Sequence, residues 1–483
     1  MSTFNTLAID LGASNVRSVL GKYDGNTIQL EELRRSETLA VDFGVIQYWD
    51  FPRIIYDVQN MIALASKRHN IKTFGIDSWG DTHCFVDKKG RLLENPQCYR
   101  DPHLKDIYQE AEKVLSRDDV ANVLGYRLKS KFRILLQTAY MTHYRKNFAD
   151  AVDSLLFMAA ALNFYLSGFK YAEHNAAASP QWAPYNSLEW NKDLLRLTGL
   201  DLRVLPEIVS SGTMIGPMSK AMHMSLGLTN TPKIVAVCEH DTGAAVSCIE
   251  NDFDSIFISQ GTWSVVGAIV DKPILDDEAI EYGFQNESCY APKIRFLKEH
   301  LGLWLLQQCR KDWKKEGKLY DYDTLDAIAL NAVPFSNLFD SDHADLFYSG
   351  NLTARISRLC SGNMSVAETV RAIFESISLR IALTCEKIKK YCKRDFSKIR
   401  LIGGGGRSDV LNRFIADATG LALEVGPFEG ACMGNVVSQL IALGEIKGIK
   451  EGGELINNSI QKKLYFPENH DKWLPILEEI GIG

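Results

Sequence analysis

The chain has 483 residues, which is too many for one hydrophobic core and fits two domains of about 240 residues each. Its hydrophobic content of 46% and charged content of 24% are ordinary for a globular protein. The net charge of −6, with basic residues spread along the chain, argues against nucleic acid or an anionic membrane as a partner.

Two further features predict a cytoplasmic protein. The start, MSTFNTLAID, lacks the positive charges and long apolar run of a signal peptide. The most apolar stretch, Leu155–Leu166, is too short to span a bilayer and contains Asn163, so a buried helix is expected there. The ten cysteines show no CxxC or Cys/His metal spacing, and we expect reduced, mostly buried thiols.

The first half of the chain mixes strands and helices. Strands are predicted at Leu7–Asp10, Ser18–Tyr23, Ile28–Arg35, Phe74–Asp77, Cys84–Asp87 and Ile234–Val237. Helical periodicity covers Pro52–Lys67 and most of residues 104–168. Residues 171–215, rich in Asn, Ser and Pro, are expected to form an irregular insertion that lines the surface.

The second half repeats this alternation. Strands are predicted at Ile256–Ser259, Trp263–Ile269, Phe284–Cys289, Ile294–Leu297, Ile399–Ile402 and Leu423–Val425. Helices are predicted at Leu301–Lys315, Val366–Tyr391, Ser408–Thr419 and Gly430–Leu443. Ser365 and Glu368 form a capping box at the start of the second of these helices. The alternation implies α/β domains, with a boundary near residues 244–254.

Two segments, one in each half, have the same pattern. Residues 7–20 are LAIDLGASNVRSVL and residues 256–266 are IFISQGTWSVV. Each predicts a strand, a glycine-containing turn and a second strand, and each turn would present backbone N–H groups and a hydroxyl to a phosphate. The pair suggests a duplicated fold that holds one nucleotide between its halves.

The first of these turns offers polar groups for a nucleotide. Asp10 ends the first strand, where a carboxylate can hold Mg²⁺ through water. Gly12 would let phosphate oxygens approach the backbone, while Ser14, Asn15 and Arg17 add donors. An ordinary hairpin, with Asp and Gly chosen only for the turn, explains the same residues.

The second half supplies two more candidate sites. In the turn 260–262, the Thr262 hydroxyl could bond a phosphate oxygen, although such turns are common. The glycine run 403–406, between a strand and a helix, would permit close approach of a flat ring or a phosphate. It lacks the GxGxxG dinucleotide pattern, and tight strand–helix packing would require one glycine rather than four.

His240, Asp241 and Thr242 follow a buried apolar strand. Phosphoryl transfer mainly requires positioning and charge neutralisation, with one carboxylate taking the proton of the nucleophilic hydroxyl, and Asp241 is placed to do so. The alternative is that Asp241 caps a helix that TGAAVSC could start. Both roles are compatible.

Taken together, these sites resemble the FGGY carbohydrate kinases of the actin-like ATPase superfamily, and within them the rhamnulokinases. The resemblance covers nearly the whole chain, residues 5–445, and its order and spacing are specific. It is carried by AIDLGAS with Arg17, GIDSWG at 75–80, YRD at 99–101, HDT at 240–242, SQGTWS at 259–264, LGLWLLQQ at 301–308, and GGG at 403–405 with Asn412. It implies an α/β fold of two ribonuclease H-like domains, residues 1–245 and 246–483, with a catalytic cleft between them.

The resemblance also implies a role for individual residues. Asp241 would be the catalytic base, and Asp10 would help to hold Mg²⁺. The residues implied to bind ATP are Ala13, Ser14, Asn15, Val16, Arg17, Thr262, Gln307 and Gly404. The residues implied to line the sugar pocket are Trp79, Gly80, His240, Thr242 and the residue at position 299, here Glu299.

Three departures from the rhamnulokinase pattern lie on the sugar side. Residues 81–83, Asp-Thr-His, follow Gly80 where Val-Asp-Phe is usual, and residues 158–160, Met-Ala-Ala, replace Met-Pro-Asp. Glu299 stands where an Asn is expected, and a carboxylate only accepts hydrogen bonds whereas an Asn also donates. An acid near a helix N-terminus is also favoured for purely structural reasons. The nucleotide side matches the pattern.

The implied reaction is ATP-dependent phosphorylation of a ketose, L-rhamnulose to L-rhamnulose 1-phosphate, in deoxysugar catabolism by a monomer or homodimer. L-Fuculose, another 6-deoxy ketose, is the first alternative, followed by L-ribulose and D-xylulose. A filament or chaperone ATPase of the same superfamily would lack the sugar-facing HDT. A regulator that binds sugar and nucleotide without catalysis is a further alternative, against which Asp10, Arg17, Asp241 and Thr262 argue.

Overall fold

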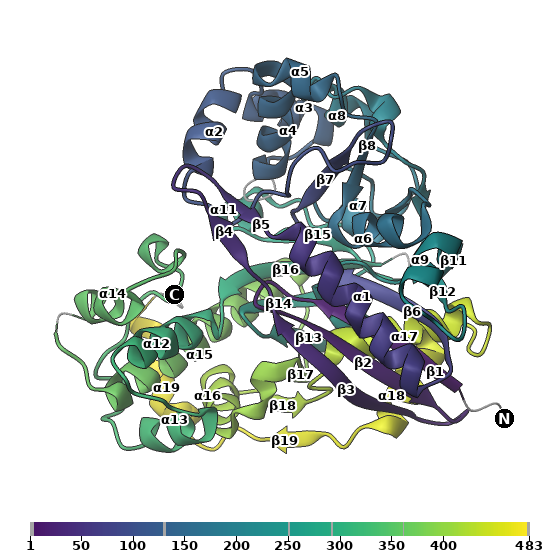
Figure 1. The fold of residues 1–483 in the computed structure, drawn as a ribbon. Helices are drawn as coiled ribbons and strands as arrows, with labels where there is room; N and C mark the ends of the chain where they lie inside the picture. Colours follow the sequence, from purple (N-terminus) through teal and green to yellow (C-terminus); the bar gives the residue numbers. More distant parts are fainter. Residues whose placement is uncertain (1–3, 129–131, 250–251, 291–292, 361, 481–483) are drawn as a thin grey trace. The chain divides into compact units, whose positions relative to one another are not determined.

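The computed structural model describes residues 4–128, 132–249, 252–290, 293–360 and 362–480 (Figure 1). The chain divides into two compact units. The first unit contains residues 1–251, 271–294 and 431–459, and the second contains residues 252–270, 295–430 and 460–483. The single predicted boundary at residues 245/246 therefore misses two later segments that pack with the first unit.

The first unit is built on a mixed sheet. Its strands, in spatial order, are β11 (Thr213–Pro217), β12 (Lys233–Ala236), β6 (Ile71–Ser78), β1 (Phe4–Leu11), β2 (Asn15–Tyr23) and β3 (Ile28–Glu37). β1, β2 and β3 form an antiparallel meander, while β6 and β12 run parallel to β1 on its other side. The strands predicted for this sheet are thereby confirmed.

Both faces of β1 are buried, because helices of the first unit cover each side. Leu7, Ile9 and Leu11 pack in one core with α1 (Phe51–Arg68), whose N-terminus is capped by the Asp50 side chain. The alternate residue Asp10 contacts α17 (Gly430–Ala442), where Cys432 Sγ lies 3.8 Å from its Oδ2. Helix α17 thus fills the second face of this sheet, and its segment joins the first unit for that reason.

A second hydrophobic core of the first unit lies in an insertion between β6 and β11. Its elements are β7 (His83–Val86), α2 (Leu104–Ala111), α3 (Arg117–Leu124), α4 (Phe132–Tyr144), α5 (Lys146–Ala149), β8 (Ser154–Phe157), α6 (Met158–Ser167), β9 (Ala172–Glu173), α7 (His174–Ala178), α8 (Lys192–Leu197), η1 (Leu202–Val204) and β10 (Ile208–Val209). Two predictions are wrong here. Leu155–Leu166 begins as strand β8 and only then becomes helix α6, and residues 171–215 carry regular elements and a wholly buried Trp182 rather than a surface loop.

The remaining elements of the first unit are short. They are β4 (Ala40–Asp42), β5 (Gln47–Trp49), α9 (Lys220–Ser225), α10 (Asp241–Ser247), α11 (Asp277–Tyr282), β15 (Gln285–Ser288) and α18 (Ile449–Ser459). Of these, β15 and α10 matter most for the candidate site.

The second unit has a sheet with the strand order β16-β14-β13-β17-β18-β19. Its strands are β13 (Ser255–Gln260), β14 (Trp263–Val270), β16 (Ile294–Leu301), β17 (Lys398–Ile402), β18 (Ala422–Val425) and β19 (Lys463–Tyr465). β13 pairs antiparallel with β14 and parallel with β17, as β1 pairs with β2 and β6. The two predicted hairpins therefore hold equivalent places in their sheets.

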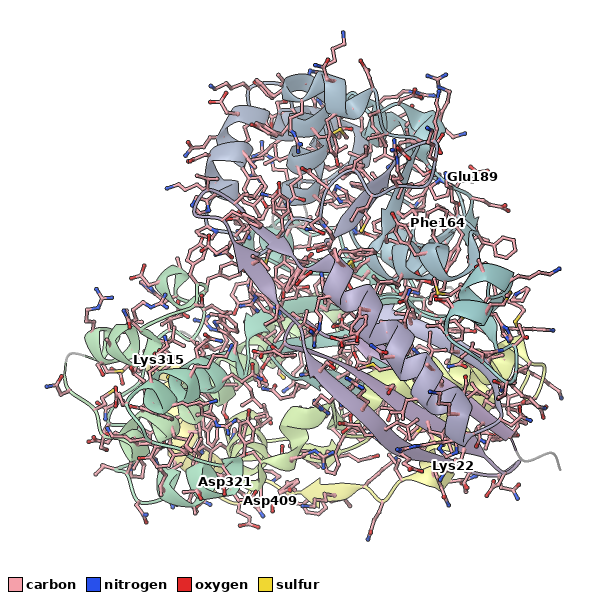
Figure 2. The ribbon with its side chains drawn as sticks, in the orientation of Figure 1. Lys22, Phe164, Glu189, Lys315, Asp321 and Asp409 are labelled. Atoms are coloured by element: carbon pink, nitrogen blue, oxygen red, sulfur yellow. The ribbon has the colours of Figure 1, made fainter. Side chains whose placement is uncertain are left out.

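Helices flank this second sheet. They are α12 (Trp304–Lys315), α13 (Tyr322–Ala329), η2 (Ala344–Leu346), α14 (Leu352–Leu359), α15 (Val366–Cys392), η3 (Gly404–Arg407), α16 (Asp409–Thr419) and α19 (His470–Glu479). The predicted capping box of Ser365 and Glu368 is present at the start of α15. Charged side chains such as Glu189 and Asp321 lie exposed at the surfaces of their units (Figure 2). Among the described helices, none is both long and apolar enough to cross a membrane.

Candidate functional site

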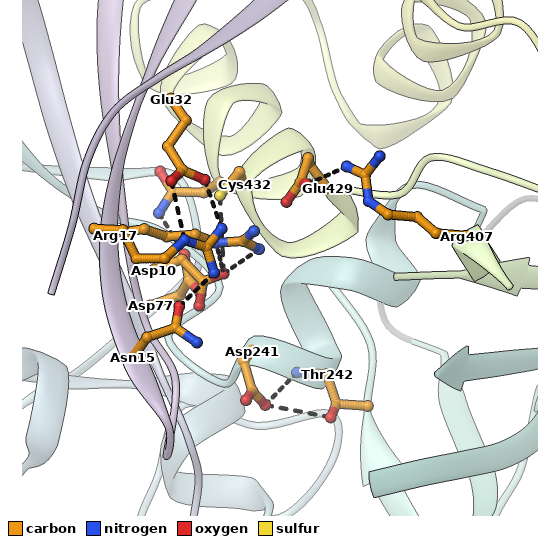
Figure 3. Close-up of polar contacts among 12 residues, drawn as sticks. Asp10, Asn15, Arg17, Glu32, Asp77, Asp241, Thr242, Arg407, Glu429 and Cys432 are labelled. Carbon is orange, nitrogen blue, oxygen red and sulfur yellow. Dashed lines mark hydrogen bonds and ion pairs between the residues drawn. The ribbon is translucent and has the colours of Figure 1, made fainter. Parts of the chain in front are cut away.

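The hairpin between β1 and β2 carries an ion pair (Figure 3). Asp10 and Arg17 face each other across the two antiparallel strands, and Arg17 donates to Asp10 Oδ2 from Nε at 2.9 Å and from Nη2 at 2.6 Å. The Gly12 N–H closes the turn on Asn15 O at 3.0 Å. That N–H is therefore not an open phosphate donor, contrary to the expectation for this turn, and Arg17 already has a carboxylate partner.

The other predicted residues of this hairpin differ in their surroundings. Asn15 Oδ1 accepts a hydrogen bond from Arg35 Nη1 at 2.8 Å. Val16 is 1% exposed and packs in the core under α1, so only its backbone could meet a ligand. Ala13 and Ser14 are partly exposed at the turn itself.

Three carboxylates gather at one edge of the first sheet. Asp77 lies opposite Asp10 in the register of the parallel strands β1 and β6. Ser78, the residue after Asp77, forms a parallel β-bridge with His240, the residue before Asp241. Asp77 is wholly buried and accepts from Asn435 Nδ2 at 2.7 Å. Burial raises the pKa of Asp77 well above its ordinary value, and the charges of Asp10 and Asp241 raise it further.

This carboxylate cluster has the chemistry of a divalent-cation site. Asp77 Oδ1 is buried and has no hydrogen-bond partner among the described residues. A cation would supply such a partner and offset the mutual repulsion that the raised pKa of Asp77 reports. Across the described residues, no group of three or more His, Cys, Asp or Glu side chains could hold a metal ion. Carboxylates such as Asp10 and Asp77 would suit a hydrated Mg²⁺ held through water.

Asp241 is the first residue of α10. The N-cap position belongs to His240, which makes no side-chain capping bond, so the predicted helix begins here but Asp241 is not its N-cap. Asp241 Oδ1 accepts from the Thr242 N–H at 2.6 Å and from the Thr242 hydroxyl at 3.3 Å (Figure 3). Its side chain is 35% exposed, so the carboxylate is accessible while the helix dipole favours its charge.

Gly80, His240 and Asp241 lie close together. His240 Nε2 is 3.6 Å from Asp241 Oδ1. A Cβ atom on Gly80 would lie 3.2 Å from His240 Nε2 and 3.7 Å from Ser179 Oγ. The absence of a side chain at Gly80 therefore keeps the space in front of His240 open.

Glu287 is a residue of this site that sequence reasoning missed. It lies on β15, is 1% exposed, and places Oε2 3.5 Å from His240 Nδ1. Ser179 Oγ donates to its Oε1 at 3.3 Å. Glu287 reaches His240 only because residues 271–294 pack with the first unit, and no local pattern in the chain signals that contact.

Backbone strain occurs beside the same residues. Asp81 and Gln181 have φ values of 61° and 68°, and neither is glycine. Asp81 follows Gly80, and Gln181 Nε2 donates to Asn286 O, next to Glu287, at 2.9 Å. Such conformations cost about 1–3 kcal/mol each and gather at functional sites.

Trp79 and His83 both contact aromatic neighbours. Trp79 is 6% exposed, packs against Trp49 in a tilted arrangement with ring centroids 4.4 Å apart, and donates from Nε1 to Thr82 Oγ1 at 2.9 Å. His83 packs against Phe85 and Trp182, and burial lowers the pKa of His83 to about 4, so its ring is neutral. Residues 158–160, another departure from the rhamnulokinase pattern, are buried at the start of α6.

In the second unit, two of the predicted nucleotide residues meet. Thr262 lies at the turn between β13 and β14, and Gln307 lies on α12. Thr262 Oγ1 is 3.5 Å from Gln307 Oε1. The Gly261 N–H closes its turn on Trp263 O at 2.8 Å, as the Gly12 N–H closes the first. Glu299 is partly buried on β16 of this unit, whereas Gly80 and His240 belong to the first.

The glycine run is explained largely by packing. A Cβ on Gly403 would lie 2.7 Å from Gln260 O, and one on Gly405 would lie 2.3 Å from Gln260 Cγ. A Cβ on Gly406 would lie 2.7 Å from the Val425 side chain. Gly404 alone has nothing within 4 Å of that position, so it is the member of the run that faces open space.

Comparisons with known proteins agree with this architecture. Residues 5–248 match the model of the FGGY family of carbohydrate kinases, N-terminal domain, and residues 256–443 match that of the C-terminal domain. The solved structures of a gluconate kinase and a ligand-bound xylulose kinase, both from Lactobacillus acidophilus, have the same fold. Each superposes with a TM-score of 0.78, at 18% and 17% identity, over 99% of this chain and 98% and 97% of theirs.

Two curated relatives are similar over nearly their whole length. A rhamnulokinase from Bacteroides thetaiotaomicron is 31% identical over 476 residues, which cover 97% of both chains. A rhamnulokinase from Oceanobacillus iheyensis is 27% identical over 465 residues, which cover 95% of this chain and 97% of the relative. The chain therefore belongs to the FGGY family of carbohydrate kinases and is an ATP-dependent sugar kinase.

Proposed function

We propose that the protein transfers the γ-phosphoryl group of ATP to O1 of a ketose, with L-rhamnulose as the first candidate and L-rhamnulose 1-phosphate as the product. The two curated rhamnulokinases are the support for that ketose. The observation that carries the proposed chemistry is the accessible Asp241 carboxylate beside His240, at the edge where Asp10 and Asp77 also end their strands.

In this proposal Asp241 is the general base. It takes the proton of the sugar hydroxyl as that oxygen bonds to the γ-phosphorus, and the bond from the γ-phosphorus to the bridging oxygen breaks to release ADP. His240 and Thr242 flank this carboxylate and orient the sugar, and Gly80 leaves room for it. Trp79 acts as the buried wall of the pocket, held by Trp49.

The nucleotide is assigned to residues of both units. Those proposed to bind it are Ala13, Ser14, Asn15, Val16 (through its backbone), Arg17, Thr262, Gln307 and Gly404. Asp10, with Asp77 beside it, would hold Mg²⁺ through water, and the ion when bound supplies charge neutralisation at the phosphates. The assignment of Glu299 to the sugar rests on the family resemblance alone.

Replacing the proposed base tests the mechanism. Asp241→Asn keeps the shape of the side chain but cannot take a proton, so kcat should fall about 10²–10⁴-fold. Asp277→Asn is a matched control, because Asp277 is exposed at the same first position of a short helix, α11, in the same unit. Near-wild-type turnover by Asp241→Asn would overturn the assignment.

A panel of ketoses in a coupled ADP assay tests the substrate. L-Rhamnulose should give the highest kcat/KM, above L-fuculose, L-ribulose and D-xylulose. A higher value for L-fuculose would identify the rival kinase. No ADP from any ketose would favour the non-catalytic regulator that binds sugar and nucleotide.

A further inference from the structure

A group of buried polar side chains, none of which is itself assigned to sugar, nucleotide or metal, lies at the end of β16, where His300 follows Glu299. His300 is 2% exposed, and its Nδ1 lies 2.5 Å from Asp342 Oδ2. Its Nε2 lies 2.8 Å from the Thr384 hydroxyl on α15. The imidazole is therefore held from both sides, by a loop and by the longest helix of the second unit.

These side chains connect directly to the backbone of Leu301, the last residue of β16. Asp342 Oδ1 accepts a hydrogen bond from the Leu301 N–H at 3.0 Å. One carboxylate thus joins the His300 ring to the first residue of the segment 301–304, which leads into α12. Arg380 Nε lies 3.7 Å from Asp342 Oδ2 and further restrains that side chain.

The segment 301–304 in turn holds the phosphate-side turn of the second unit. Gly302 and Trp304 donate their N–H groups to Thr262 O, each at 3.1 Å, and Leu303 donates to Gly261 O at 2.9 Å. A Cβ on Gly302 would lie 2.6 Å from the Trp263 backbone, so the two segments are in close contact. A shift of 301–304 must therefore move the turn that carries Thr262.

The protonation states suit this arrangement. Burial lowers the pKa of His300, although the nearby Asp342 opposes that change. Burial acts to raise the pKa of Asp342, but the His300 charge and the hydrogen bonds from His300 and Leu301 hold it at about 2. Asp342 is therefore an anion at neutral pH and can accept both hydrogen bonds at once.

We propose that His300 is a positioning residue for the nucleotide, because it fixes Asp342, and through Asp342 the segment 301–304 and the Thr262 turn. This inference rests on the proposed binding of ATP by Thr262 and extends it to His300, Asp342 and Thr384, none of which is assigned to the nucleotide. Its consequence is selective. Loss of the His300–Asp342 link should weaken nucleotide binding and leave the KM for the ketose unchanged.

Calorimetric titration with ADP, in the absence of sugar, tests the proposal through four variants. Asp342→Ala and His300→Gln break the link to Asp342, and each should weaken ADP binding about tenfold. His300→Asn retains an amide donor near the position of Nδ1, so it should stay within about threefold of wild type. The control is Asp345→Ala, an exposed carboxylate three residues further along the chain, which should have no effect.

The outcomes separate the two proposals. Unchanged ADP affinity in Asp342→Ala, or a parallel rise of the ATP and ketose KM values, would overturn the positioning role. No ADP binding by the wild type would overturn the proposed function itself. If urea titrations show that the His300 variants do not fold, Asp342→Ala and Thr384→Val test the same proposal, because these two residues are the hydrogen-bond partners of the His300 ring.

Discussion

The Asp77 carboxyl shows how a single buried group links this site to stability. Its side chain is inaccessible, and only Oδ2 has a hydrogen-bond partner among the described residues. Burial, Asp10 and Asp241 all raise the pKa of Asp77. The folded chain therefore binds this proton more tightly than the unfolded chain does.

Replacing Asp77 by Asn should remove this dependence on pH. As pH rises from about 4, the usual carboxyl pKa, towards the raised pKa of the folded state, the native protein holds more protons than the unfolded chain. The wild-type free energy of unfolding should therefore fall through that range, by at most about 1.4 kcal/mol per pH unit from this group, and the Asp77→Asn variant should lack that decline.

Urea titrations of both proteins near pH 5 and near pH 8, without Mg²⁺ or nucleotide, measure the difference. The free energy of unfolding of Asp77→Asn, relative to that of the wild type, should be higher near pH 8 than near pH 5. The same difference in free energy of unfolding at both pH values would contradict the raised pKa of Asp77.

At the scale of elements, the contact between α10 and α17 positions the proposed base. A Cβ on Gly434 of α17 would lie only 1.9 Å from Ala244 O of α10. Because α10 begins at Asp241, the close approach of these helices determines where that carboxylate lies. Only glycine allows this distance, since any side chain would meet the backbone carbonyl.

Gly434→Ala should therefore push α10 away from α17. We expect the free energy of unfolding to drop by about 1–3 kcal/mol from the steric overlap, and kcat to fall because Asp241 moves with α10. Gly448→Ala is the control, because nothing lies within 4 Å of its Cβ position, and its effect should stay within about 0.5 kcal/mol. Wild-type stability and turnover in Gly434→Ala would show that the helices adjust without cost.

At the scale of the whole molecule, the chain passes repeatedly between two units that repeat one strand arrangement. All of its ten cysteines but Cys360 and Cys392 are buried. Burial raises the pKa of Cys360, and raises that of Cys392 to about 11. The prediction that most of these thiols are buried is confirmed.

This distribution predicts slow thiol chemistry in the folded protein. Ellman's reagent should react slowly with the native chain, since thiolates are the reactive species and burial disfavours them. In guanidinium, without any reductant, all ten thiols should react at once. The melting temperature should be the same with and without dithiothreitol, and fewer than ten thiols in the unfolded chain would indicate an unexpected disulfide.

Much of the fold and part of the site follow from local sequence. Short runs rich in apolar residues predict β1, β2, β6, β13 and β17, and the capping box at Ser365 predicts the start of α15. The residues that follow His240 predict a helix there, although the structure starts it at Asp241 and not after that residue. These features depend on hydrogen bonds and side-chain spacing within a few residues, so a short stretch of sequence is enough to predict them.

Only the tertiary structure decides which distant segments meet. Glu287 reaches His240, and α17 covers the first sheet, because two late segments return to the first unit. Most of the glycine run packs against Gln260 and Val425 rather than facing a ligand, which leaves Gly404 as the open position. The reason is that such contacts join residues far apart in the chain, so their distances depend on the packing of whole elements and not on any local pattern.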